Sequence, residues 1–345
     1  MQKKSKKSNL VGQGLIGVYM KRIFFSILIF CSVQVAESSV LVHPHCGCGF
    51  FVDAAVEGIY VEEPDIGFYG LVDPDDTPAV IFDPSYLTAR VNGTVGYTCV
   101  ANDWFRCLGD QLQVYVSSSY FQCQEKKEQS SPEGTGVQIF GIDGGGEGGT
   151  VPGGQDAYFE ACLWENHTEA MLGGAHCYYG GFNLYSAVGF GFIYRHQQFK
   201  NRLVYPVVPF DNGTITEDLD TYYRGVKIEL GVSKQFCDCW TLSIVPTFGI
   251  YSACTEFCGY QTWGQSEFAP TSVAGKLEKT AYQGALRSSL VYDWCGYYFG
   301  GQAFVDYLSY VPGIFNIRED DDGPSHITEK NSFRYGGGFV IGKLF

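Results

Sequence analysis

The residues best equipped for chemistry in this 345-residue chain are its 13 cysteines. Cysteine thiols bind zinc or form disulfides, and the redox compartment of the protein decides between the two. Cysteines lie close together in the segments HPHCGC (43–48) and CDC (237–239). The first segment also holds His43 and His45, but zinc sites usually space their cysteines more widely. We therefore expect disulfides, no metal and no cofactor.

Candidates for catalysis are sparse. None of the histidines lies in a recognisable nucleophile context, so we expect no enzyme. The acidic run at 319–322 has the ligand type that calcium prefers, but a solvated loop is the simpler interpretation. The histidines are His43, His45, His167, His176, His196 and His326.

The composition favours strands over helices. The chain holds 24 Tyr, 26 Phe and 44 Gly, and only 17% of its residues are charged. Aromatic side chains suit a pleated surface, and glycine suits turns and bends. The net charge of −14 argues against nucleic acid as a partner, because phosphate binding needs clustered Lys and Arg.

The N-terminus carries an export signal. Lys21 and Arg22 precede an apolar run from Ile23 to Val35, and small residues follow. This run is too short to span a bilayer and is typical of a signal peptide. We predict an upstream basic extension at 1–19 with Met20 as the true start, a signal peptide at 20–38, a periplasmic segment at 39–48 and one domain at 49–345. The exported part then lies in an oxidising compartment, which favours disulfides over zinc.

The exported part alternates apolar and polar residues with period two, as in Val226 to Ser233. Such segments form strands with one apolar and one polar face. A soluble sandwich turns the apolar face inward, and a membrane barrel turns it outward to lipid. The barrel is favoured by segments of about 10–14 residues, by charged residues in mid-strand and by connections that alternate between short and long.

The alternation predicts an all-β, antiparallel transmembrane β-barrel of about ten strands, within a range of 8–14. A weak strand near 156–164, followed by a turn near 165–180, makes the number even. Long polar connections at 63–85, 124–155, 200–221, 253–278 and 311–331 are the expected outer loops. The nine clear strands are 49–62, 86–98, 110–123, 181–194, 222–234, 239–252, 280–293, 297–310 and 333–345.

Three predictions follow from this map. The terminal Phe345 ends an alternating strand, which is how such barrels are presented to the barrel-assembly machinery, and Lys343 on the same face would snorkel to the periplasmic interface. Nine cysteines near the periplasmic rim are candidates for disulfides or cross-links: Cys46, Cys48, Cys99, Cys107, Cys162, Cys177, Cys237, Cys239 and Cys295. Charged residues on polar faces are pore-lining candidates: Asp53, Glu57, Arg90, Lys227, Glu229, Arg287 and Asp306.

The chain resembles the major outer membrane proteins of chlamydia-like bacteria and of Legionella. The resemblance rests on GFFVDAAVEGIY (49–60), RGVKIELGVSKQFCDCWTLSIVPTFGIY (224–251) and RYGGGFVIGKLF (334–345). It implies a bacterial outer-membrane porin that passes small solutes, together with a disulfide-stabilised envelope.

A structural or adhesive surface barrel with a plugged lumen is the alternative, because a ten-stranded barrel is narrow. Outer-membrane lipid is the expected surrounding. Other cysteine-rich envelope proteins, joined by disulfides, and a homo-oligomer are further candidate partners.

Overall fold

The computed structural model describes residues 48–63, 66–72, 79–82, 85–102, 109–131, 136–140, 142, 146–147, 155–178, 180–204, 213–237, 239–263, 270–315 and 326–345. The predicted extension at 1–19 and signal peptide at 20–38 lie outside the described residues, as does nearly all of the segment at 39–48. No helix among the described residues is long and apolar enough to cross a membrane.

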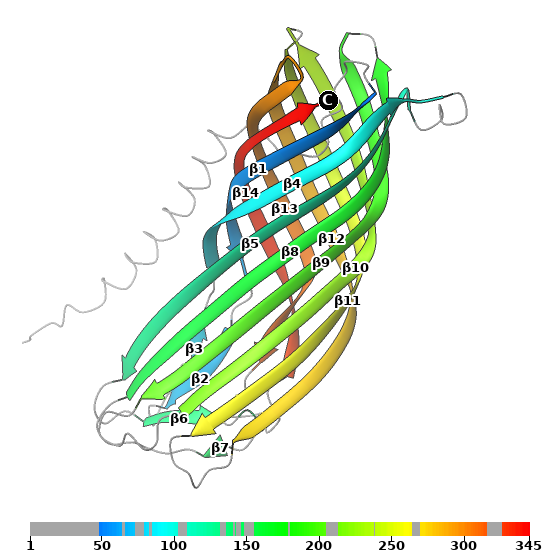
Figure 1. Cartoon of the computed structure of the whole chain (residues 1–345). Coiled ribbons are helices and arrows are strands. Elements are labelled where there is room, and N and C mark those ends of the chain that lie inside the picture. The colour runs from blue at the N-terminus through cyan, green and yellow to red at the C-terminus, as the bar shows by residue number, and fades with distance from the viewer. Residues whose placement is uncertain are drawn as a thin grey trace, which may run out of the picture.

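Ten antiparallel strands form a closed barrel, as predicted (Figure 1). Sequence neighbours pair with each other around the wall, and β1 closes the barrel by pairing with both β14 and β4. The strands are β1 (Gly49–Glu62), β4 (Ser85–Val100), β5 (Gln111–Ser131), β8 (Gln155–Tyr178), β9 (Phe182–Val204), β10 (Gly213–Phe236), β11 (Trp240–Trp263), β12 (Thr271–Trp294), β13 (Tyr297–Phe315) and β14 (His326–Leu344).

One end of the barrel, here called the turn end, carries the short connections and both Cys48 and Phe345. Tight hairpins join the strands there. Cys295 and Gly296, between β12 and β13, have φ of 51° and 82°, as the twist of a two-residue hairpin requires. Gly180 and Gly181, in the three-residue connection between β8 and β9, have φ of 83° and 76°. In outer-membrane barrels the short turns face the periplasm.

The opposite end, here called the loop end, carries the long connections. Four short strands form a separate sheet there, in the order β3-β2-β6-β7 (Figure 1). They are β2 (Ile66–Val72), β3 (Ala79–Phe82), β6 (Gly136–Phe140) and β7 (Gly146–Glu147).

The weak strand predicted near 156–164 exists, but the turn predicted near 165–180 was wrong. That strand is the first part of β8, which continues to Tyr178, and the hairpin follows at Gly180 and Gly181. The reason is that the outward face of β8 changes character, from Glu160 and Cys162 near the loop end to Leu172 near the turn end. A strand without a uniform apolar face lacks the period-two signal.

Several predicted outer loops are also strand in the structure. Residues 213–221, 253–263 and 271–278 extend β10, β11 and β12 toward the loop end. Their outward side chains are mostly polar, so their sequence is typical of a loop. Residues 213–221 and 253–261 pair with the strands on both sides, and residues 271–278 pair with β11.

Candidate functional site

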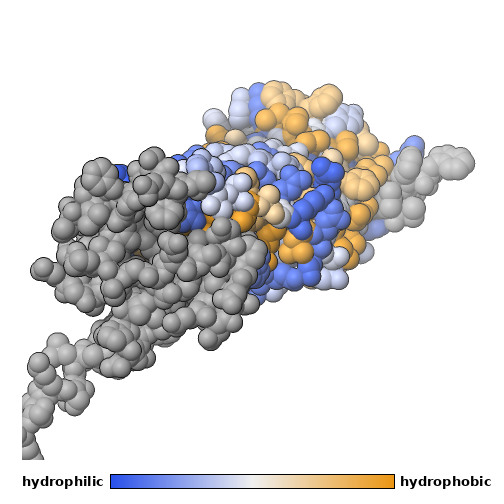
Figure 2. Space-filling view, turned by 90° about the horizontal axis from the view of Figure 1, so that it is seen from below, coloured by the Kyte–Doolittle hydropathy of each residue, from blue (hydrophilic) through white to orange (hydrophobic). Residues whose placement is uncertain are grey.

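The outside of the barrel is apolar over the half nearest the turn end. Exposed aliphatic and aromatic residues cover this band, including Val91, Phe190, Phe248 and Phe339. Figure 2 shows hydrophobic residues gathered toward the far end of the wall and hydrophilic ones nearer the viewer. An exposed apolar band of this kind is the lipid-facing surface of a membrane barrel.

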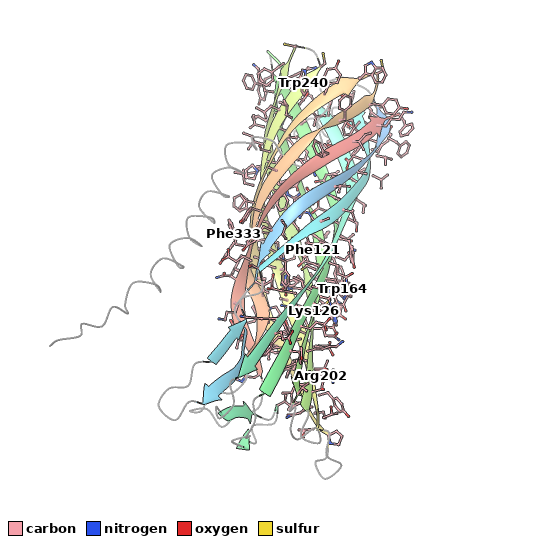
Figure 3. All side chains as sticks on the ribbon, turned by 90° about the vertical axis from the view of Figure 1, so that its left-hand side faces the viewer. Phe121, Lys126, Trp164, Arg202, Trp240 and Phe333 are labelled. Atoms are coloured by element: carbon pink, nitrogen blue, oxygen red, sulfur yellow. The ribbon has the colours of Figure 1, made fainter. Side chains whose placement is uncertain are left out.

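Aromatic residues border the band on both sides, as expected at the two membrane interfaces. Trp240 lies near the turn end, whereas Phe333 and Trp164 lie farther toward the loop end (Figure 3). The girdle at the turn end includes Phe50, Tyr178, Phe182, Phe236, Trp240, Trp294, Tyr297 and Phe345. The second girdle includes Tyr60, Tyr120, Trp164, Tyr194, Tyr222, Tyr282, Tyr307 and Phe333.

Beyond the second girdle, the outward face of the strands becomes polar. On β9, the outward positions change from Phe190 and Phe192 to His196 and Gln198 as the strand passes Tyr194. The inward positions over the same stretch are mixed: Phe199 is 3% exposed, and Gln197 and Asn201 beside it are buried polar residues. The outer half of the wall therefore has a polar outside, and its inside combines apolar side chains with buried polar ones.

The seven predicted pore-lining residues all face the interior, and all are buried. Asp53 accepts a hydrogen bond from the Tyr298 hydroxyl at 3.2 Å. Arg90 pairs with Glu57, and its guanidinium lies 4.0 Å from the centre of the Phe304 ring. These side chains fill the lumen rather than border an open channel.

A charged cluster surrounds Lys227, which has no exposed surface. Its ammonium group pairs with Glu169 and lies 3.1 Å from Glu229. Glu229 also accepts a 2.7 Å hydrogen bond from Tyr115 and lies 3.8 Å from Arg287. Three of the predicted residues, Lys227, Glu229 and Arg287, thus meet in one network.

A second charged cluster lies closer to the loop end. Both arms of Arg334 donate to Glu165, at 2.5 and 2.8 Å, and Arg195 donates to the same carboxylate at 3.1 Å. Arg195 also pairs with Glu63. The predicted Asp306 lies 3.9 Å from Arg334 and joins this cluster.

Sequence reasoning missed Glu63, Glu165, Glu169, Arg195 and Arg334. Glu165, Glu169, Arg195 and Arg334 lie on the inward side of their strands, so parity alone marks them as lumen residues, and Glu63 directly follows β1 with the same parity. The missing information was the extent of the strands, because Glu165 and Glu169 fell in a predicted turn.

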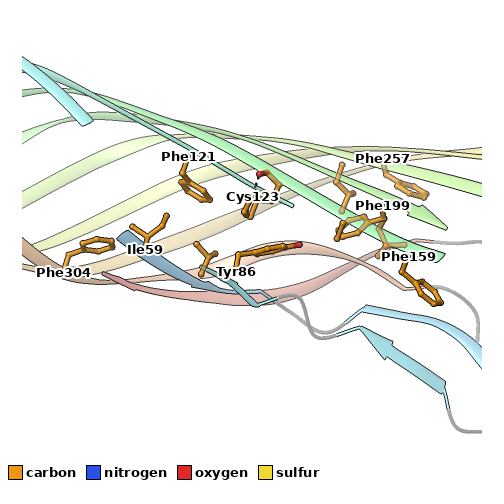
Figure 4. Close-up of a cluster of buried hydrophobic side chains, with 13 residues drawn as sticks. Ile59, Tyr86, Phe121, Cys123, Phe159, Phe199, Phe257 and Phe304 are labelled. Atoms are coloured by element: carbon orange, nitrogen blue, oxygen red, sulfur yellow. Dashed lines mark hydrogen bonds between the residues drawn. The ribbon is translucent and has the colours of Figure 1, made fainter. Parts of the chain in front are cut away.

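An apolar cluster lies in the lumen beside the second charged cluster, with Arg334 5.6 Å from the Phe121 ring, and extends toward the loop end (Figure 4). Phe121, Phe159 and Phe199 point into the barrel from the neighbouring strands β5, β8 and β9. Tyr86 joins them from β4, next to β5, and Phe304 from β13 on the opposite wall. All five are at most 6% exposed. Close-packed aromatic side chains of this kind exclude water from the barrel interior.

Six of the nine predicted rim cysteines lie at the turn end: Cys48, Cys99, Cys177, Cys237, Cys239 and Cys295. Cys46 and Cys107 lie outside the described residues. Cys162 was misplaced, since it faces outward on the loop-end half of β8, where Gln124 of β5 and Gln198 of β9 flank it. No disulfide joins two of the cysteines among the described residues.

No group of three or more His, Cys, Asp or Glu side chains among the described residues is arranged to hold a metal ion. The residues considered for zinc at 43–46 and for calcium at 319–322 lie outside the described part of the chain.

The sequence matches no protein-family model and no curated protein. Among solved structures, the chain is similar to the outer membrane protease OmpT from Escherichia coli, with 11% identity, a TM-score of 0.47 and coverage of 88% of this chain and 99% of that one. A Pseudomonas aeruginosa FadL homologue has 7% identity, a TM-score of 0.26 and coverage of 86% and 90%. The translocator domain of autotransporter NalP from Neisseria meningitidis has 10% identity, a TM-score of 0.22 and coverage of 88% and 90%.

These likenesses are too distant to carry an activity over to this chain. The apolar band, its two aromatic girdles and the closed antiparallel wall carry the conclusion instead. The chain has the architecture of an outer-membrane β-barrel.

Proposed function

We propose that this protein is a bacterial surface barrel with a filled lumen, whose role is structural or adhesive rather than catalytic. The observation that carries the proposal is the apolar cluster around Phe121 and Phe199, which closes the barrel on the loop-end side. A diffusion pore needs a continuous wet path. The two buried ion-pair clusters also occupy the lumen at membrane depth, and Lys227, Glu229 and Arg195 in them have no exposed surface.

The outer half of the wall supports the same proposal. On β9, ten residues follow Tyr194, or about 33 Å of strand at ~3.3 Å per residue. A wall of this length beyond the outer girdle is not needed to cross a membrane. It places a folded, polar-surfaced extension outside the cell, where it can meet neighbouring proteins or a host surface.

The cysteines at the turn end support a part in envelope cross-linking. Cys237 and Cys295 have φ of 49° and 51°, a left-handed conformation that costs roughly 1–2 kcal/mol for residues other than glycine. Asparagine or glycine would suit these positions better, so the thiols themselves are the reason to hold cysteine there. Cys237 and Cys295 are also exposed and free to meet a partner protein.

Cys48 and Cys99 fit an internal disulfide better than a cross-link. The paired residues Gly49 and Thr98 lie at the end of the β1–β4 ladder, so the next position brings Cys48 opposite Cys99. The amide of Val100 donates to the Cys48 sulfur at 3.4 Å, which keeps this thiol against β4.

Conductance in a planar bilayer tests the filled lumen. We expect correctly folded protein, recognised by heat-modifiable gel migration, to stay silent with and without reductant. Steady openings of defined size would contradict the proposal and support a solute-passing porin. Neutralising Arg90 and Arg287 should then raise cation selectivity.

Non-reducing gels of whole envelopes test the cross-linking. We expect oligomeric bands that disappear on reduction and weaken when Cys237 and Cys295 are both changed to asparagine. The matched control is Cys123→Ser, because Cys123 is buried inside the barrel. Monomer alone in the wild type would remove the cross-linking role.

A further inference from the structure

Arg224 lies on the lipid-facing side of β10, within the second aromatic girdle. Its side chain is exposed and lies one outward position closer to the turn end than Tyr222. Tyr222 stacks on Tyr194 of β9, with ring centres 4.8 Å apart and an angle of 19° between the planes. The cross-strand neighbours of Arg224 are Phe192 on β9 and Ser252 on β11.

Several other outward cations of the described wall have a partner within the chain, while Lys200 and Arg202 are exposed farther out on β9, beyond the second girdle. Lys126 and Lys276 pair with glutamates at 3.4 and 3.1 Å, on the polar outer half of the wall. Lys234 and Lys343 lie over aromatic rings near the turn end, at 3.7 and 4.6 Å.

Arg224 has no such partner. On β10, the next outward carboxylate toward the loop end is Asp220, two outward positions away. Asp220 is already engaged, since it accepts hydrogen bonds from Tyr194 at 2.6 Å and His196 at 2.9 Å. The guanidinium of Arg224 is therefore a lone positive charge on an aromatic and apolar surface.

A lone charge on the lipid face of a barrel is tolerated only near the interface, where headgroups and water can reach it. The girdle places Arg224 at that depth. A lipid phosphate is the complementary group there, and the planar guanidinium fork binds phosphate in a bidentate manner. The Ser252 hydroxyl, on the same face of the adjacent strand, is a second donor.

We propose that Arg224 and Ser252 bind the phosphate of an outer-leaflet lipid headgroup. Asp218, Asp220 and Glu256 lie farther out on β10 and β11 and repel phosphate, which favours binding at the depth of Arg224 on these two strands. Such a contact fixes how deep β10 sits in the membrane.

Native mass spectrometry of the refolded protein in detergent tests the site. The probes are bisphosphorylated lipid A and the same lipid with its phosphates removed. We expect the wild type to prefer the phosphorylated lipid, and Arg224→Gln to bind it about tenfold more weakly, equivalent to ~1.4 kcal/mol. Arg224→Lys should retain part of the affinity, because it keeps the charge but loses the fork.

Lys276→Gln is the matched control, since it removes the same charge on the same side of the membrane. We expect it to bind lipid A as the wild type does. If the Arg224 and Lys276 variants lost equal affinity for lipid A, the effect would be one of net charge, and the proposed site would be wrong. Equal binding of both lipids by the wild type would also overturn it, without recourse to any variant. Inorganic phosphate alone should not bind, and tight binding of it would contradict a lipid as the ligand.

Discussion

Replacing Glu165 with glutamine tests whether the buried ion pairs stabilise the barrel. Glu165 is 2% exposed and accepts three hydrogen bonds from Arg195 and Arg334. Glutamine keeps the shape of the side chain, but its NH₂ group replaces an acceptor oxygen and faces guanidinium N–H groups. Breaking a buried pair in this way costs about 3–5 kcal/mol. Because Glu63 and Asp306 still face the two arginines, we expect the lower end of this range, about 3 kcal/mol.

The free energy of unfolding can be measured by urea titration in detergent micelles, followed by tryptophan fluorescence. Glu160→Gln is the control on the same strand, because Glu160 pairs with Lys126 at the surface, where their side chains are 32% and 68% exposed. Such exposed pairs contribute about 0–1 kcal/mol. If Glu165→Gln lowered the free energy of unfolding no more than Glu160→Gln does, the view that burial strengthens the inner ion pairs would be refuted.

Three further predictions concern packing, assembly and orientation. Tyr251 has no exposed surface and donates a 2.8 Å hydrogen bond to Gln283, so Tyr251→Phe should cost about 1 kcal/mol and Tyr251→Ala about 3–5 kcal/mol in the same titration. Deleting Phe345 should lower the fraction of heat-modifiable protein in the outer membrane several-fold, and an unchanged fraction would remove its role as an assembly signal. A membrane-impermeant maleimide should label Cys258 on intact cells but Cys177 only after permeabilisation. The reverse pattern would show that the barrel has the opposite orientation in the membrane.

Much of the fold was predictable because the side-chain period of a strand is two. The predicted strand at 49–62 has the bounds of β1, and the parity of each segment placed all seven lumen candidates on the inside. Parity needs only local sequence. It also marks Arg334, between the outward Phe333 and Tyr335, as an inward residue.

What escaped prediction depends on register, which links residues far apart in sequence. Arg334 pairs with Glu165 across the lumen, 169 positions away in the sequence, and no local sequence pattern predicts that contact. The misplacement of Cys162 has a related cause. A strand whose outward face turns polar looks like a loop, so the sequence pattern moved the turn about 15 residues too early.

The change of the outward face near Tyr194 also bears on how the lumen is filled. A ten-stranded wall encloses a space that side chains can fill. Within the membrane the outward face must be apolar, which leaves polar and charged residues for the inside, and these must pair with each other once buried. Outside the membrane the outward face meets water, so the inside is free to be apolar, and Phe121, Phe159 and Phe199 pack there as in a soluble protein. Extending the barrel beyond the membrane and closing its lumen are therefore two consequences of the same change in solvent.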